Sequence, residues 1–314
     1  MNDRDLLPPE RKDDLRRAER LEWWSIGWMA SIILVVGLAM GTSQAMRTAW
    51  IEDLLSLVPP IAFLLSRHWE KKGPSARFPF GFQRVNSLAF LIAATALASF
   101  GALLLVNALK TLVMGERVTI GMVELFGLQL WAGWLMVAAM IYSIIPPVIL
   151  GRKKIKVAQR LQDKALFTDA KMNKADWMTG LAGIAGVLGL GFGWWWADAA
   201  AAAFISFDVL HDGIKAMRSA TAELIDGTPR ALENNEVAED AQALQEELGR
   251  RLPGAHVRLR ETGRYIRVVV EGTPPPSTNS FADEVWPGPS HRRWRLAEIT
   301  FRPPDQDPRE RDPS

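Results

Sequence analysis

Cysteine is absent from the 314 residues, which excludes disulfides, thiolate metal sites and cysteine nucleophiles. Net charge is nearly absent too: 37 Lys and Arg stand against 35 Asp and Glu. This balance argues against a nucleic-acid partner bound through bulk positive charge. The sequence has no Gly-rich dinucleotide fingerprint, no phosphate-binding loop and no recognisable nucleophile–base constellation. We therefore predict that the protein is not an enzyme, carries no prosthetic group and is not an ATP-driven pump.

Long apolar stretches are what the sequence does have, although its mean hydropathy is only +0.02. A helix needs about 20 mostly apolar residues to cross the hydrocarbon core of a bilayer. Blocks near or above that length cover residues 23–41, 45–66, 86–113, 119–150, 177–197 and 199–217. They predict a multi-pass integral membrane protein with six transmembrane helices, whose partner is the lipid bilayer.

Lys and Arg are distributed unequally between the segments that join these blocks. One side of the predicted membrane holds six in residues 1–21, five in 67–84 and eight in 152–174, against three on the other side. Cytoplasmic loops carry the excess of Lys and Arg, so both termini are predicted to be cytoplasmic. Trp194, Trp195 and Trp196 fit an interfacial anchor at the outer surface.

The predicted domains follow from these patterns. Residues 1–21 are a charged cytoplasmic segment, 22–218 the transmembrane domain, 219–230 a linker, 231–303 a cytoplasmic α+β domain and 304–314 a disordered tail. Within the α+β domain, apolar spacing predicts an amphipathic helix over 231–251, and alternation predicts a β-hairpin of His256–Arg260 and Tyr265–Glu271. A last strand is predicted over Arg295–Arg302.

Ionisable residues inside predicted spans are candidates for function, because each costs about 2.5–3.5 kcal/mol to insert. The second span offers Glu52, Asp53 and Ser56, and Pro59-Pro60 just beyond should kink it and free backbone carbonyls. Two helices that each carry an i,i+4 polar pair are able to converge on one divalent cation. The alternative is a purely structural role, in which such acids lie at helix ends or pair with lysines.

Two later spans supply further candidates. Met172 and Asp176 are i,i+4 partners at the start of the fifth span, with Asn173 beside them. In the sixth span, Asp208 and His211 share one face with Asp212, and Asp208 is roughly 15 Å deep at 1.5 Å per residue. Asp212 is also placed to pair with Lys215 near the cytoplasmic end.

These features together resemble the cation diffusion facilitator family of metal/proton antiporters, over residues 22 to 302. The matching stretches are Ala49-Trp-Ile-Glu-Asp-Leu-Leu-Ser56, Phe78-Pro-Phe-Gly-Phe-Gln-Arg-Val-Asn-Ser-Leu88, the segment Asp169–Asp176, Ala197-Asp-Ala and Glu223-Leu-Ile-Asp226. The resemblance implies six spans, a ferredoxin-like, metallochaperone-like cytoplasmic domain, a homodimer, and export of a divalent cation in exchange for protons. A bacterial inner membrane is the implied location.

The family's (H/D)xxxD ligand pairs are only partly kept. One register of the second span gives Glu52 and Ser56, the other gives Ala49 and Asp53, and the fifth span gives Met172 and Asp176. In the loop motif, phenylalanines replace both histidines and Asn86 replaces the glutamate, so the resemblance implies that any loop metal site is lost. His256 and His291 are too few for the binuclear zinc site of many members, which leaves dimerisation through that domain open.

Three interpretations remain. In the first, the protein is an active antiporter whose oxygen ligands favour Mn²⁺, Fe²⁺ or another hard cation, with zinc less clearly indicated. In the second, it is a degenerate relative that acts as a membrane interaction or regulatory subunit. In the third, a cation follows a route past Asp208 and His211. The surviving acids favour transport, because a protein that no longer transports has little reason to bear their insertion cost.

Overall fold

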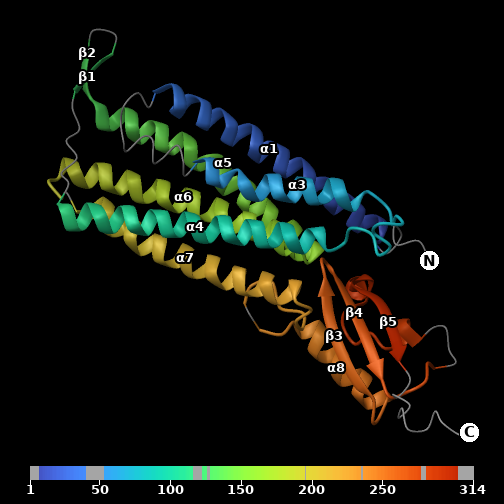
Figure 1. Ribbon diagram of the computed structural model, residues 1–314. Helices are drawn as coiled ribbons and strands as arrows, with labels where there is room; N and C mark the ends of the chain where they lie inside the picture. Colours follow the sequence, from blue (N-terminus) through green and yellow to red (C-terminus); the bar gives the residue numbers. More distant parts are fainter. Residues whose placement is uncertain are drawn as a thin grey trace, which may run out of the picture.

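The computed structural model describes residues 7–39, 53–115, 122–125, 128–194, 196–234, 236–276 and 281–302. Its long helices run side by side in an elongated bundle, with a small sheet at one end (Figure 1). The helices of the bundle are α1 (Pro9–Ala39), α3 (Val58–Glu70), α4 (Val85–Met114), α5 (Ala132–Leu161), α6 (Lys164–Gly191) and α7 (Ala197–Leu224). A helical domain followed by a small α+β domain agrees with the predicted architecture.

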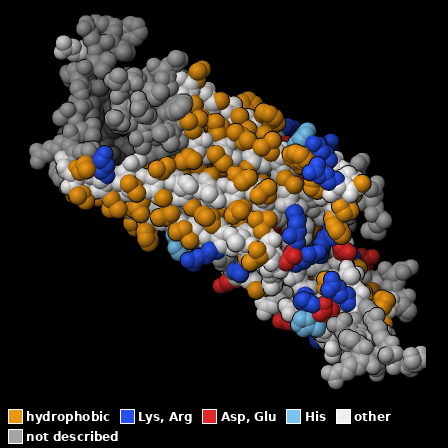
Figure 2. Space-filling model, viewed as in Figure 1, with side chains coloured by type: hydrophobic (Ala, Val, Ile, Leu, Met, Phe, Trp, Pro, Cys, Tyr) orange, Lys and Arg blue, Asp and Glu red, His pale blue; other side chains and the backbone are white. Residues whose placement is uncertain are grey.

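The surface of the bundle is apolar. Figure 2 shows hydrophobic side chains spread over its visible face, whereas Lys, Arg, Asp and Glu gather toward the end that carries the sheet. Exposed large side chains include Val106, Phe204 and Phe207. Among the described residues, α4 alone is both long and apolar enough to cross a membrane, with a mean hydropathy of 2.3 over its most apolar stretch.

The fourth apolar block does not form one continuous helix from residue 119 to 150. Strands β1 (Met122–Leu125) and β2 (Leu128–Trp131) pair antiparallel at the end of the bundle opposite the sheet, and α5 begins only at Ala132 (Figure 1). The strand sequences are Met-Val-Glu-Leu and Leu-Gln-Leu-Trp, and their register places Glu124 opposite Gln129. A short apolar run of this kind is compatible with a strand as well as with part of a helix.

Small residues allow the helices of the bundle to pack closely. A side chain added at Gly101 of α4 would place its Cβ 2.5 Å from the backbone nitrogen of Leu210 on α7. Gly213 of α7 lies equally close to the backbone of Ala98 on α4. Gly180 of α6 is packed in the same way, because a Cβ there would lie 2.6 Å from the side chain of Ile144 on α5.

The proline pair interrupts the second span where a kink was predicted. Residues 53–56 form one helical turn, Leu57 breaks it, and α3 begins at Val58 with the prolines in its first turn. Because Pro59 and Pro60 have no N–H, the carbonyls of Leu55 and Ser56 lose their helical donors. Backbone oxygens are therefore freed next to Asp53 and Ser56.

The sheet at the end of the bundle has the predicted hairpin and last strand. Strands β3 (His256–Thr262) and β4 (Tyr265–Glu271) pair antiparallel, and β5 (Leu296–Arg302) pairs parallel with β4. Alternate residues Ile266, Val268 and Val270 of β4 are buried. They pack with Leu244 and Leu248 of α8 (Glu239–Arg251) to form the core of this domain.

The helix predicted from residue 231 begins eight residues later, at Glu239. The preceding segment forms a bridge between Arg230 and Val237. The side-chain oxygen of Asn234 accepts the N–H of Glu236 at 3.2 Å, a local turn that competes with helix formation. Among the described residues between β4 and β5, the helical elements are α9 (Phe281–Glu284) and a short 3-10 helix, η2 (Ser290–Arg295).

Candidate metal site

Ser56 and Asp176 join the second and fifth predicted spans. The Ser56 hydroxyl donates to Asp176 Oδ1 at 2.9 Å, and Ser56 is 5% exposed. Asp53, one turn before Ser56, lies close enough to Asp176 for the two carboxylates to repel each other. Residues from both possible registers of the second span therefore meet Asp176, which sequence spacing alone left open.

The other predicted ligands contribute unequally. Glu52 lies outside the described residues. Met172 is fully buried and packs in a cluster with Leu97 and Phe100 of α4. Within the part of the chain that the structure describes, no three His, Asp or Glu side chains gather as a metal-binding group. The donors at hand are the carboxylates of Asp53 and Asp176, the Ser56 hydroxyl and the carbonyls freed by the prolines.

A chain of buried polar side chains continues from this point along α6. Asn173 donates to the backbone oxygen of Asp169 at 3.0 Å. Asp169 pairs with Lys154 of α5, which also donates to Glu22 of α1 at 2.7 Å. Lys154 and Glu22 are completely buried. Both Lys154 and Asp169 lie near enough to Asp176 to interact with it electrostatically. Two carboxylates, of Glu22 and Asp169, thus pair with the Lys154 ammonium group, and Asp176 lies near it.

Asp208 and His211, the secondary candidates of the sixth span, face outward. Both are exposed, and Asp208 lies 3.9 Å from Lys174. Asp212, which was predicted to pair with Lys215 on its own helix, forms an ion pair with Lys171 of α6 instead, at 2.5 Å. The structure therefore brings α6 lysines, and not Asp176, to these side chains.

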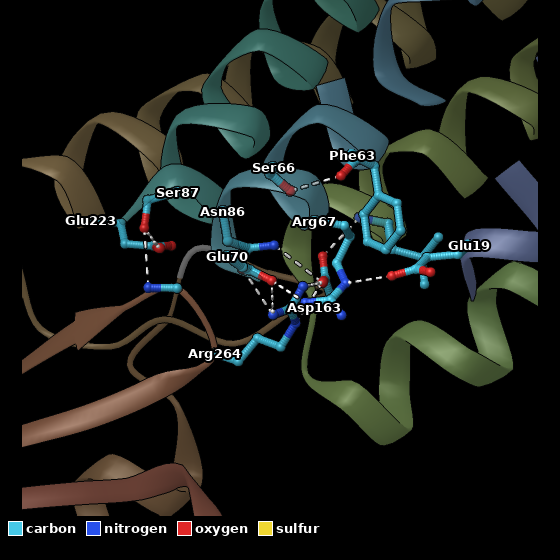
Figure 3. Close-up of polar contacts among 12 residues, drawn as sticks. Glu19, Phe63, Ser66, Arg67, Glu70, Asn86, Ser87, Asp163, Glu223 and Arg264 are labelled. Carbon is cyan, nitrogen blue, oxygen red and sulfur yellow. Dashed lines mark hydrogen bonds and ion pairs between the residues drawn. The ribbon is translucent and has the colours of Figure 1, made fainter. Parts of the chain in front are cut away.

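The loop motif over residues 78–88 receives the tip of the β3–β4 hairpin. Figure 3 shows Arg264, from the hairpin turn, pointing at carboxylates from two parts of the bundle. Its Nε donates to Asp163 Oδ2 at 2.7 Å and its Nη1 contacts both oxygens of Glu70 at 3.0 Å. Asn86, at the position of the family's glutamate, donates to Asp163 at 3.2 Å. Asn86 therefore contacts the same carboxylate as Arg264 of the docked hairpin.

A second buried charge cluster lies beside this contact. The N–H of Gly263 donates to Ser87 at 3.1 Å, and Ser87 in turn donates to Glu223 at the end of α7 (Figure 3). Lys164 bridges Glu223 and Glu261. Burial raises the pKa of Glu223 to about 7, against the opposing charge of Lys164. Gly263 has a φ of +61°, and a Cβ at this position would lie 2.7 Å from the carbonyl oxygen of Gln83. Glycine is therefore required there.

Sequence reasoning missed the buried charges of this end of the bundle. Lys154 and Lys164 were counted among the residues that set orientation, and Glu22, at the start of the predicted transmembrane domain, was not considered. A signal was present, because Lys154 falls in a run of basic residues at a position that puts it on the same helix face as Val157, Ala158 and Leu161, all buried. A basic residue on an apolar face indicates a buried partner.

The many exposed apolar side chains on the described helices are typical of a helical membrane protein. Comparison with known proteins places the chain within that class. The cation efflux transmembrane domain matches residues 24–225, more than half of the chain, so the chain belongs to the cation efflux family, as predicted from its motifs. It is also similar to the manganese efflux system protein MneS of Bacillus subtilis (strain 168), with 22% identity over 221 residues, covering 69% of this chain and 72% of that protein.

Proposed function

We propose that this protein exports a hard divalent cation, Mn²⁺ before Fe²⁺ or Zn²⁺, from the cytoplasm. The observation that carries the proposal is the meeting of Asp53, Ser56 and Asp176 beside carbonyls freed by Pro59 and Pro60. Oxygen donors of this kind suit Mn²⁺, whereas zinc favours imidazole and thiolate. The similarity to a manganese efflux protein supports the same choice.

Exchange against protons is the mechanism that we propose for this export. A carboxylate that releases a metal ion to the outside is then free to take a proton, and it must lose that proton before it binds the next cation. Asp176 is the central group, because it accepts a hydrogen bond from Ser56 and interacts electrostatically with Asp53 and Lys154. Asp53 and the freed carbonyls would complete the cation's shell.

The arrangement around this site belongs to the proposal as well. Six spans over residues 22–218, both termini in the cytoplasm and a cytoplasmic domain over 231–303 place Lys154 and the hairpin contact on the cytoplasmic side. We also propose that the protein is a homodimer in a bacterial inner membrane. The sheet domain and the 19-to-3 distribution of Lys and Arg support this orientation.

Uptake into everted vesicles or proteoliposomes with an imposed pH gradient tests the proposal. The wild-type protein is expected to move Mn²⁺, and Asp176→Asn and Asp53→Asn are expected to lower that flux at least tenfold. Asp208→Asn is the matched control, because it makes the same change at an exposed carboxylate, and it is expected to keep the wild-type rate.

Two results would contradict the proposal in different ways. If no divalent cation moves in the wild type, transport is refuted and the regulatory-subunit interpretation takes its place. If cations move but Asp176→Asn is as active as Asp208→Asn, the family function stands and the site is wrong.

A further inference from the structure

A groove of about 710 Å³ runs between α1 and α5, on the outside of the bundle. Five cationic side chains line it: Arg17, Arg20, Lys153, Lys156 and Arg160. None of the described residues along this groove is acidic. Lys and Arg are nearly matched by Asp and Glu over the whole chain, so five cations along one groove are a local excess of positive charge. Such an excess favours the binding of an anion.

Most of these cations have no internal partner. Arg160 lies 3.2 Å from Asp14, whereas Arg17, Arg20, Lys153 and Lys156 are exposed and form no ion pair with another described residue. Lys154, between the two groove lysines, shows the contrast, since it is completely buried against Glu22 and Asp169. The helix α5 thus sends one lysine inward to carboxylates and two outward to the groove.

The groove also changes character along its length, in the same direction on both helices. On α1, the arginines are followed by Trp24, 73% exposed, and by Trp28; on α5, the basic residues are preceded by Ile149, 47% exposed, and by Pro146. From Arg17 to Trp28 the distance is roughly 16 Å at 1.5 Å per residue. Exposed tryptophans are typical of the membrane–water interface. The charged part therefore lies at the level of headgroups and the apolar part at the level of acyl chains.

We propose that this groove binds an anionic phospholipid, with the phosphate against the arginines and lysines and the acyl chains along Trp24 and Ile149. An amphiphile matches both parts, whereas an inorganic anion or an acidic peptide would leave the apolar part uncovered. A zwitterionic lipid brings its own cation to a lining that has no described carboxylate to receive it. Basic pockets between helices on the cytoplasmic side are suited to anionic headgroups.

Native mass spectrometry of the full-length protein, titrated with phosphatidylglycerol or phosphatidylcholine, tests this proposal. The groove variant is Arg17→Gln/Arg20→Gln/Lys153→Gln/Lys156→Gln. The matched control also removes four charges, from exposed cations outside the groove: Lys72→Gln/Arg77→Gln/Arg152→Gln/Arg218→Gln. At roughly fivefold in affinity per cation, the groove variant is expected to bind phosphatidylglycerol several-hundredfold more weakly, and at least tenfold more weakly, than the control.

Several results would overturn the proposal. These are equal retention of the two lipids by the wild type, wild-type affinity in the groove variant, or equal loss in the control. Displacement of phosphatidylglycerol by inorganic phosphate would assign the groove to a free anion. A change from dimer to monomer with unchanged lipid affinity would assign it to a second copy of the chain. If the groove variant does not fold, Arg20→Gln/Lys153→Gln takes its place, with an expected loss of about twenty-fivefold.

Discussion

Replacement of Arg264 by Gln should loosen the contact between the hairpin and the helical bundle. The Arg264 side chain is 2% exposed and pairs with Asp163, which is completely buried, and with Glu70. Burial lowers the pKa of the guanidinium, but the Asp163 and Glu70 carboxylates outweigh this effect and raise it, so Arg264 stays charged. Glutamine would leave the Asp163 carboxylate with two remaining donors, Asn86 and the N–H of Leu166.

Loss of one partner of a buried ion pair costs about 3–5 kcal/mol, because the other charge stays buried. The two remaining donors place this case near the lower limit. A loss of about 3 kcal/mol corresponds to roughly 6–12 °C in the thermal midpoint for a domain of 150–250 residues. Arg264→Lys should give an intermediate loss, since an ammonium group does not reproduce the fork that reaches both carboxylates.

Thermal unfolding of the full chain in one detergent, together with proteolysis of the segment between α7 and α8, measures the effect. Arg258→Gln is the control on the same hairpin, because Arg258 pairs with Glu271 and its side chain is 58% exposed. An exposed pair contributes no more than about 1 kcal/mol. Equal shifts for Arg264→Gln and Arg258→Gln would refute the reasoning that burial makes the Arg264 pair important.

Three further predictions concern packing, pH and selectivity. Gly101→Ala should lower the free energy of unfolding by about 1–3 kcal/mol, and with it the thermal midpoint, because the added methyl group overpacks against α7. Gly249→Ala, in open space on α8, should raise the midpoint slightly. An unchanged midpoint in Gly101→Ala would contradict the close approach of α4 and α7. Glu223 has a raised pKa of about 7, so the stability that its protonated form contributes is complete below about pH 4.5 and is lost as pH rises through 7. Thermal midpoints between pH 5 and 8 should therefore fall less steeply in Glu223→Gln, and an unchanged slope would argue against this group. Met172→His should move vesicle uptake from Mn²⁺ toward Zn²⁺, because imidazole suits zinc; an unchanged preference would place Met172 outside the cation's shell.

The C-terminal domain was largely predictable from its sequence, because local patterns determine it. The alternation around Val268 and the turn at Gly263 place β3, β4 and β5 where they are found. The start of α8 was missed because Asn234 forms a local turn that apolar spacing does not reveal. The hairpin of β1 and β2 was missed because periodicity does not separate a short apolar strand from a segment of an apolar helix.

The site was predictable only in part, since it depends on how distant segments meet. Spacing identified Ser56 and Asp176, but their hydrogen bond is a contact between residues 120 positions apart. Composition gave no reason to join Lys154 to Glu22, 132 positions away, because that pairing follows from the packing of α1 on α5. Asp208 was included because depth along a helix is calculable from sequence, whereas the direction that the helix faces depends on its neighbours.

The close contact of α4 with α7 has a consequence for that last point. Gly213 lies against the backbone of Ala98, and Leu210 against Gly101, so α7 is held against rotation about its own axis at two places one turn apart. Asp208 is five residues before Gly213, which puts it roughly 140° around the helix from the contact. Turning Asp208 toward the interior would require α7 to leave α4 altogether. The close packing of two helix backbones, and not the charge of Asp208, therefore holds this carboxylate at the exposed face of α7 beside Lys174.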